Sequence, residues 1–177
     1  MERRVNIFLG GSIISQWNTA YILPNCQNIN LGLSKMTAND LLRNYSNVII
    51  NINNKENIQN IILYVGSNDV TTNKEKEGKI VGNIIDFIKF LQKTINNTNI
   101  IFIAILKSPN RKPNEIKKID YINQKMREFI NHNNNNNLYF CNFNRQLRSL
   151  ENYQSDKTHL SEIGYFNLTR SLQEILK

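Results

Sequence analysis

Apolar residues gather in short runs along the chain, and each run ends close to a turn-forming residue. The first run, Val5–Leu9, is β-branched or aromatic in character and stops at Gly10 and Gly11. Runs of this kind are typical of strands that are covered on both faces of a parallel sheet. The pattern predicts strands at Val5–Leu9, Ile29–Leu31, Asn60–Val65, Ile100–Leu106 and Leu138–Phe140.

Between these strands the apolar residues follow a helical period, with isoleucines one turn apart in the clearest cases. This spacing predicts helices over 78–95, 114–130 and 161–176. Thr37 has the character of a helix N-cap. The Asn-rich segment Asn47–Asn60 fits either a strand or a loop, and Asn133–Asn137 is expected to form a surface turn.

Strands that alternate with helices imply right-handed crossovers and a parallel sheet between two layers of helices. A chain of 177 residues is long enough to bury one core of ordinary size, so we expect one domain over 1–177. In such a sheet ligands bind beyond the carboxyl ends of the strands. The residues that follow each strand are therefore the first place to look for chemistry.

The predicted strand ends carry a distinctive set of polar groups. They hold Gly10-Gly11-Ser12, then Gly32, then Gly66-Ser67-Asn68-Asp69, and the loop before the last helix holds Asp156-Lys157-Thr158-His159. Together they supply a hydroxyl, an imidazole, a carboxylate and a carboxamide, and their glycines allow the backbone to come close to a ligand. Acyl transfer requires a nucleophile, a base, a group that orients the base and donors for an oxyanion.

His159 is the better candidate for the base because the chain has only two histidines. His132 lies beside the Asn-rich turn, where a solvated side chain without a role is expected. An imidazole can accept a serine proton near neutral pH and return it to a leaving group. Asp156 could accept the proton on Nδ1 of His159, although Asp-x-x-His alone also fits a helix-capping aspartate with an incidental histidine.

Four blocks of this chain resemble, in the same order, the four sequence blocks of the SGNH (GDSL-like) hydrolase family. They are Ile7-Phe8-Leu9-Gly10-Gly11-Ser12-Ile13, Asn30-Leu31-Gly32-Leu33-Ser34, Tyr64-Val65-Gly66-Ser67-Asn68-Asp69, and Asp156-Lys157-Thr158-His159-Leu160 followed by Gly164-Tyr165. Any one block is a weak signal. The ordered set, which extends from residue 5 to residue 165, is a strong one.

The resemblance implies a role for each matching residue. Ser12 would be the nucleophile, with His159 and Asp156 completing a catalytic triad. The backbone N–H groups of Ser12 and Gly32 and the side-chain amide of Asn68 would form the oxyanion hole. The resemblance also implies a flavodoxin-like, three-layer α/β/α sandwich around a parallel sheet, here with five predicted strands, and hydrolysis of esters or thioesters without a cofactor or metal.

One position departs from the family pattern, because Gly11 stands where the family usually has Asp. That Asp supports the turn and is not a triad member, so we expect its loss to alter turn stability or substrate preference rather than abolish chemistry. Residue 14 is Ile, which argues against the Gly-x-Ser-x-Gly elbow of the α/β-hydrolases. Gly10-Gly11 also lacks the Walker lysine and the dinucleotide-binding spacing.

The net charge is +8, from 22 Lys and Arg against 14 Asp and Glu. Such a chain attracts polyanions, but its cations are scattered, and AT-rich coding would enrich Lys, Asn and Ile together. We expect no specific nucleic-acid partner. Cys26 and Cys141 lack metal-ligand or redox spacing and are expected to be buried free thiols. The sequence suggests neither a signal peptide nor a membrane span, so a cytoplasmic protein is expected.

These observations favour a serine hydrolase that cleaves carboxylic esters of a sugar or lipid through an acyl-enzyme on Ser12. Short loops around the site favour a small acyl group such as acetyl. The alternative is a catalytically inactive binding module with the same fold, and nucleic-acid binding is a third hypothesis that rests on charge alone. The sequence leaves the leaving group and the oligomeric state open.

Overall fold

The computed structural model describes residues 4–20, 22, 23, 25–72, 74–133 and 136–176. Its centre is a five-stranded, all-parallel sheet with the order β2-β1-β3-β4-β5. The strands are β1 (Arg4–Gly10), β2 (Cys26–Asn30), β3 (Ile58–Tyr64), β4 (Asn99–Ile103) and β5 (Leu138–Cys141). This order is flavodoxin-like, and the predicted parallel sheet is confirmed.

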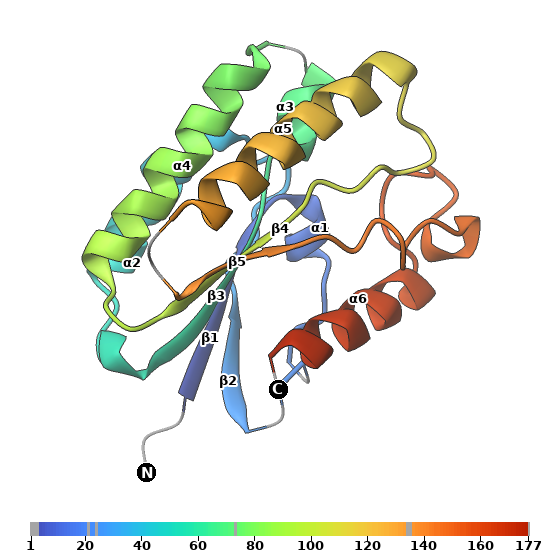
Figure 1. The fold of residues 1–177 in the computed structure, drawn as a ribbon. Helices are drawn as coiled ribbons and strands as arrows, with labels where there is room; N and C mark the ends of the chain where they lie inside the picture. The colour runs from blue at the N-terminus through green and yellow to red at the C-terminus, as the bar shows by residue number, and fades with distance from the viewer. Residues whose placement is uncertain (1–3, 21, 24, 73, 134–135, 177) are drawn as a thin grey trace.

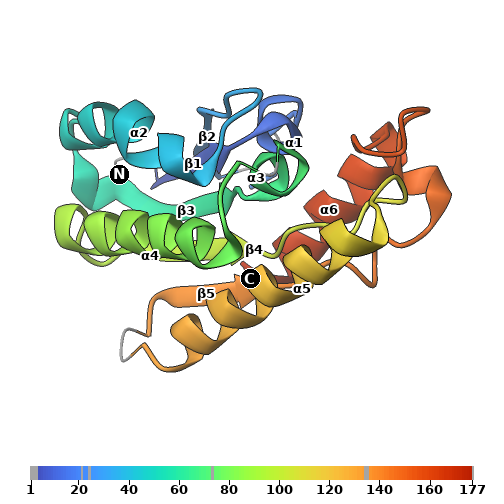
Figure 2. The ribbon, with the colours of Figure 1, turned by 90° about the horizontal axis from the view of Figure 1, so that it is seen from above.

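Helices cover both faces of the sheet (Figure 1). In the described ranges the α-helices are α1 (Ser12–Ser15), α2 (Leu41–Ile50), α3 (Ser67–Thr72), α4 (Glu77–Thr94), α5 (Pro113–Asn131) and α6 (Glu162–Ile175), and the short 3₁₀ helices are η1 (Ala38–Asp40), η2 (Lys55–Asn57) and η3 (Leu150–Asn152). One core lies between the sheet and α2, α4 and α5, and a second lies between the sheet and α1 and α6. Figure 2 shows α4 and α5 side by side.

Alternation along the strands explains the two cores. Ile7 and Leu9 of β1 belong to the first core, whereas Phe8 between them belongs to the second, and all three are fully buried. Successive side chains of a strand point to opposite faces. The uninterrupted apolar runs in the sequence are therefore the mark of a sheet that is covered on both sides, and the predicted three-layer α/β/α architecture is confirmed.

Several predicted boundaries differ from those of the structure, among them those of β2, which covers Cys26–Asn30 and not Ile29–Leu31. Of the segment Asn47–Asn60, interpreted as strand or loop, residues 47–50 are instead the last turn of α2, whose buried face carries Tyr45 and Ile49, whereas residues 58–60 begin strand β3. The predicted strand Ile100–Leu106 ends earlier, at Ile103. The reason is Asn123 of α5, whose side chain accepts from Ile105 N at 2.8 Å and donates to Ile105 O at 3.0 Å. At Ile105 these side-chain bonds take the place of backbone hydrogen bonds to a neighbouring strand.

The short helices α1 and α3 were not predicted, whereas the three long ones match the helical periods in the sequence. Thr37 does begin a helical segment: its N–H and its hydroxyl both donate to Asp40 Oδ2, at 3.1 and 2.6 Å, in a capping box around η1. Of the predicted Asn-rich turn, residues 136 and 137 form a turn, and residues 134 and 135 lie outside the described residues.

A row of asparagine side chains crosses four strands near their amino ends. Asn99 donates to Asn60 at 2.9 Å, Asn60 to Asn6 at 2.7 Å, and Asn6 to Asn28 at 2.9 Å. These residues stand opposite one another in the strand register, on the face that packs against α6. Asn6 and Asn60 are buried, and each amide satisfies the next across the sheet.

The two cysteines are free and lie on β2 and β5, the opposite edges of the sheet. Cys141 is buried as expected, and burial raises the pKa of its thiol to about 11. Cys26 on β2 is only partly buried, contrary to the expectation.

The order of the strands fixes where a site can form. From β1 the chain leads to β2 on one side, and β3 lies on the other side of β1. In flavodoxin-like sheets the crevice for a ligand opens at such a change of direction, beyond the carboxyl ends of the strands. Ser12 follows β1, Gly32 follows β2, and Ser67 and Asn68 follow β3, so all four are placed around this point.

Candidate active site

Ser12 is the first residue of α1 and stands directly after β1. The turn before it depends on Gly10, whose φ is +144° and where an added Cβ would lie 1.9 Å from the carbonyl oxygen of Tyr64 in β3. Only glycine accommodates both the conformation and the close approach. The turn leaves the side chain of Ser12 partly exposed, and its backbone N–H has no acceptor among the described residues.

The side chains of Ser12, His159 and Asp156 form one chain of hydrogen bonds. Nε2 of His159 lies 3.0 Å from Oγ of Ser12, and Nδ1 of His159 lies 2.6 Å from Oδ2 of Asp156. Across 147 positions of sequence, a hydroxyl, an imidazole and a carboxylate thus meet in the order that nucleophilic catalysis requires.

Asp156 is held by the loop that it belongs to. Its Oδ1 accepts from the backbone N–H groups of Thr158 at 2.9 Å and His159 at 3.0 Å. The hydrogen bond with the His159 side chain, helped by these backbone bonds, lowers the pKa of Asp156 to about 2. An ionised Asp156 fixes the tautomer of His159 that leaves Nε2 free to accept the Ser12 proton.

The loop itself is closed at its base. Gln154 N donates to His159 O at 2.8 Å, the Gln154 side chain donates to Leu160 O at 2.9 Å, and Ser161 then caps α6 by accepting from Gly164 N at 3.1 Å. These bonds connect the loop to a fourteen-residue helix that is packed against the sheet. The imidazole is therefore presented by a short, tied segment.

Asn68 lies at the start of α3, next to Gly11 in the turn before Ser12. Its Nδ2 donates to the carbonyl oxygen of Met36 at 2.9 Å, which leaves one of its two N–H bonds for another acceptor. An added Cβ on Gly11 would lie 3.2 Å from Nδ2 of Asn68, a tight contact. A side chain at position 11 would thus press on this amide.

Gly32 packs directly against the helix that carries Ser12. An added Cβ there would lie 2.4 Å from Ser15 N and 2.8 Å from the carbonyl carbon of Ile14, so position 32 requires glycine. Its N–H donates to Oδ1 of Asn30 at 2.9 Å. The Asn30 amide in turn donates to Ile14 O at 2.7 Å and to Trp17 O at 2.9 Å, which ties the end of β2 to α1.

Three polar residues around the site had no role in the sequence interpretation. Asn30 was only part of a matching block, and so was Asp69, although Asp69 is buried and accepts from Ala38 N with both oxygens, at 3.1 and 3.0 Å. Burial raises the pKa of Asp69. Arg111, which donates to Ser67 and Thr71 of α3, left no signal in the sequence because its partners are 40 or more positions away.

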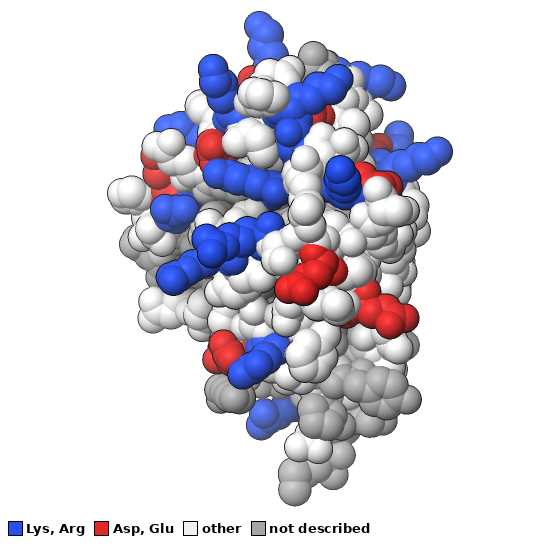
Figure 3. All heavy atoms as spheres, turned by 90° about the vertical axis from the view of Figure 1, so that its right-hand side faces the viewer, with Lys and Arg blue, Asp and Glu red and all other residues white. Residues whose placement is uncertain are grey.

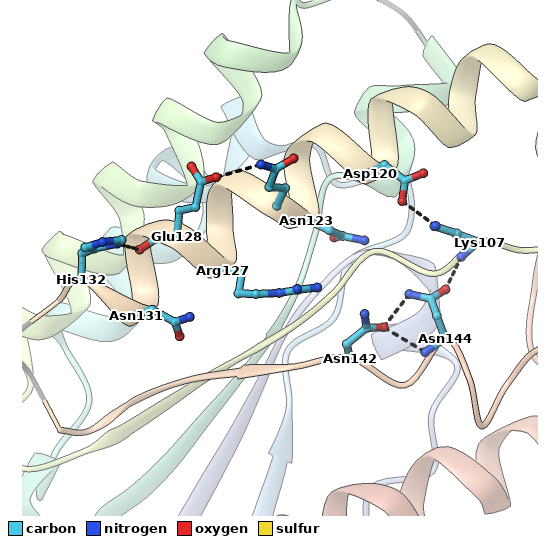
Figure 4. A pocket seen from close by; sticks show the side chains of 10 residues that line it. Lys107, Asp120, Asn123, Arg127, Glu128, Asn131, His132, Asn142 and Asn144 are labelled. Carbon is cyan, nitrogen blue, oxygen red and sulfur yellow. Dashed lines mark hydrogen bonds and ion pairs between the residues drawn. The ribbon is translucent and has the colours of Figure 1, made fainter.

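A separate cavity of about 570 Å³ lies between α5 and the segments after β4 and β5 (Figure 4). Lys107, Arg127 and Asn144 line it, and so does His132, whose Nδ1 lies 2.7 Å from Glu128 O at the end of α5. None of the five predicted site residues lines this cavity. Nowhere in the described part of the chain do three His, Cys, Asp or Glu side chains gather as a metal site requires.

On the face shown in Figure 3 basic side chains gather over the upper half, with acidic residues among them. No helix in the described ranges combines the length and apolar character needed to cross a membrane. The expectation of no specific nucleic-acid partner stays a prediction.

No family model and no curated protein matches the sequence. Solved structures do match in fold. A protein from Streptococcus pneumonia, provisionally named a platelet activating factor, has a TM-score of 0.84 and 20% identity over 100% of this chain and 86% of its own. A member of the lipolytic protein G-D-S-L family from Veillonella parvula has a TM-score of 0.80 and 13% identity, covering 97% of both chains.

A third match is a serine-to-alanine catalytic mutant of an acetylxylan esterase from Geobacillus stearothermophilus. Its TM-score is 0.77 with 15% identity, and the match covers 97% of this chain and 93% of that one. At these identities the likeness shows a common fold. The chain has the three-layer fold of the SGNH, or lipolytic G-D-S-L, hydrolases, as its four sequence blocks predicted.

Proposed function

We propose that this protein is a serine esterase that hydrolyses carboxylic esters through an acyl-enzyme on Ser12. The observation that carries the proposal is the hydrogen-bond chain from Ser12 Oγ to His159 Nε2, at 3.0 Å, and from His159 Nδ1 to Asp156, at 2.6 Å. This chain of hydrogen bonds lies beyond the strand ends of an SGNH fold, where ligands bind in such sheets. An acetylxylan esterase has the same fold, which supports the same activity.

The reaction follows from these contacts. Nε2 of His159 takes the proton of Ser12 as Oγ attacks the ester carbonyl carbon, and the imidazolium that forms is stabilised by ionised Asp156. The tetrahedral intermediate collapses when His159 passes that proton to the departing alcohol, which leaves an acyl-Ser12 ester. Water, deprotonated by His159, then attacks the acyl carbon, and His159 returns this proton to Oγ of Ser12 as the acyl bond breaks, which releases the carboxylic acid and restores the Ser12 hydroxyl.

Three donors are proposed to stabilise the oxyanion of each tetrahedral intermediate. The Ser12 N–H has no acceptor within the described part of the chain, and Asn68 keeps one N–H beyond its bond to Met36. The Gly32 N–H already donates to Asn30, so its contribution requires that bond to be shared or lengthened. The rate acceleration therefore depends most on Ser12 N–H and Asn68, and each such donor is worth roughly 2.7–4 kcal/mol in comparable hydrolases.

A small acyl group, acetyl above all, is the proposed acid part of the substrate, joined to a sugar or lipid alcohol. The acetylxylan esterase supports an acetylated sugar, whereas the lipolytic family member supports a lipid ester. A panel of p-nitrophenyl esters of increasing chain length, followed by acetylated xylan oligosaccharides, tests the choice. A preference for long chains would refute the small acyl group without affecting the esterase proposal.

The test of catalysis is turnover of p-nitrophenyl acetate together with labelling by a fluorophosphonate probe. We expect the wild type to do both and Ser12→Ala to do neither while it keeps its fold. Ser15→Ala is the matched control, because Ser15 lies on the same helix and its hydroxyl bonds, among the residues that the structure describes, to Ser12 O and Ser34 Oγ. Likewise, His159→Ala should lose turnover and His132→Ala should keep it.

A folded wild type that neither hydrolyses esters nor labels at Ser12 would overturn the proposal in favour of a non-catalytic binding module.

A further inference from the structure

We propose that Arg111 is a positioning residue that fixes helix α3, and through it Asn68, relative to Ser12. The inference rests on the proposed function for its catalytic consequence, but the contacts that carry it are independent of any reaction. They connect the segment after β4 to both sides of the site.

The side chain of Arg111 is only 6% exposed, and it donates hydrogen bonds to two residues of α3. One terminal nitrogen donates to the hydroxyl of Thr71, and the other donates to the hydroxyl of Ser67 and, at 3.3 Å, to its carbonyl oxygen. Glu115 lies 3.6 Å from the guanidinium and is its ion-pair partner. A guanidinium buried to this degree cannot reach a substrate, so its effect must pass through the helix.

Helix α3 needs such a partner because it has only six residues. A helix this short is not stable by itself and takes its position from its contacts. On one side Asp69 accepts from Ala38 N, and Asn68 donates to Met36 O. Arg111 supplies the contact on the other side, at Ser67, the residue directly before Asn68.

The neighbouring residue, Asn110, contacts the histidine loop. Its backbone N–H donates to Lys157 O at 3.2 Å, and its side chain donates to Thr158 Oγ1 at 3.3 Å. Two consecutive residues therefore hold the helix of the proposed oxyanion donor and the loop of the proposed base. This arrangement sets the distance between the two halves of the site.

The chemistry of the contact requires arginine rather than a simple positive charge. A guanidinium presents several N–H donors in a rigid plane, whereas an ammonium is a point charge on a flexible stem. Lysine at position 111 could reach Ser67 or Thr71 but could not hold both in one geometry. Arg111→Lys should therefore be impaired, although less than Arg111→Met, which has no donors at all.

The first measurement is kinetic. Arg111→Met should lower kcat for p-nitrophenyl acetate roughly 10- to 100-fold with little change in KM, because displacing a catalytic group by about 1 Å costs that much. In an Asn68→Ala background the same substitution should change kcat less than about threefold, because the group it positions is gone. Arg170→Met is the matched control, because the Arg170 side chain on α6 is 72% exposed, and this variant should behave like wild type.

The second measurement is hydrogen exchange followed by mass spectrometry, which needs no activity. In Arg111→Met the amides of Ser67–Thr72 should exchange faster, and those of α4 should be unchanged. If Arg111→Met does not fold, Arg111→Lys serves in both measurements.

Additive losses of kcat in the double variant, or unchanged exchange in α3, would overturn the inference while leaving the esterase proposal intact. A wild type without esterase activity whose α3 still loosens in Arg111→Met would overturn the proposed function and support the positioning role.

Discussion

Replacing Asn60 with leucine should destabilise the protein even though leucine has nearly the same shape and is more apolar. Asn60 is 2% exposed and stands in the middle of the asparagine row. Its amide donates to Asn6 Oδ1 at 2.7 Å and its oxygen accepts from Asn99 at 2.9 Å. The substitution removes both bonds and leaves the Asn6 oxygen, which is fully buried, without a donor.

The magnitude follows from the burial of the groups left behind. A buried acceptor without a partner costs about 1–3 kcal/mol, and each lost hydrogen bond contributes about 1 kcal/mol. Asn99 is partly exposed and lines an open cavity of about 280 Å³, so water can replace its lost acceptor. We expect Asn60→Leu to lower the free energy of unfolding by about 2–3 kcal/mol.

The double variant Asn6→Leu/Asn60→Leu provides the decisive comparison. Removing both buried members leaves only the ends of the row, Asn28 and Asn99, without their partners, and both are partly exposed. Replacing both partners of a buried hydrogen bond with apolar groups can be nearly neutral. The double variant should therefore be more stable than Asn60→Leu, by about 1 kcal/mol or more.

Urea unfolding measures these differences, with circular dichroism and the fluorescence of Trp17, the single tryptophan, followed in parallel. Coincident transitions establish that the two probes report one event. Asn53→Leu, on an exposed asparagine, is the control and should change stability by less than about 0.5 kcal/mol. If the double variant lost the sum of the two single losses, the row would not be a coupled network.

Three further predictions concern individual side chains. Asn68→Ala should lower kcat more than it raises KM, because its amide acts on charge that forms in the transition state, and an effect confined to KM would contradict the oxyanion role. The pKa of Asp156 is about 2 in the folded protein against an ordinary 3.8, so its ionised form stabilises the fold above about pH 4, and this contribution is lost as the pH falls toward 2. The Tm difference between wild type and Asp156→Asn should therefore shrink over that range, and a constant difference would contradict the assignment. Burial raises the pKa of the Cys141 thiol to about 11. Ellman's reagent at pH 8 should therefore react only with the partly buried Cys26 in the native protein, and with both thiols in denaturant. Rapid reaction of both thiols in the native protein would contradict the packing of Cys141 on β5.

The meeting of Ser12 and His159 could be predicted from the sequence because Ser12 follows a strand end and the block around His159 resembles the last block of the SGNH family. Buried runs that alternate with helical periods imply a parallel sheet, and a parallel sheet brings every strand end to one edge. The residues at those ends can then be read off without knowing any packing. The same argument brought Asn68 to this edge, and the structure places its amide next to Gly11, one residue before Ser12.

The short helices could not be predicted because their sequences carry no period. Helix α1 has four residues and α3 has six, fewer than two turns each, so amphipathic spacing is not visible. Their conformation is decided by tertiary contacts, such as those from Asn30 to α1 and from Arg111 to α3. The asparagine row was hidden for a similar reason, because its members match only after the strand register is known.

The polar residues that sequence reasoning missed share one physical task, and it explains why the site can be rigid although its helices are short. A preorganised oxyanion hole lowers a barrier only if its donors do not have to move during the reaction. Asn30 binds the last carbonyls of the α1 turn and the Gly32 N–H, Asp69 binds the amide of Ala38, and Arg111 binds the first turn of α3. Each replaces, with a fixed side-chain contact, the stability that a longer helix would have provided by itself. Substitutions at these three positions should therefore affect kcat before they affect the overall fold.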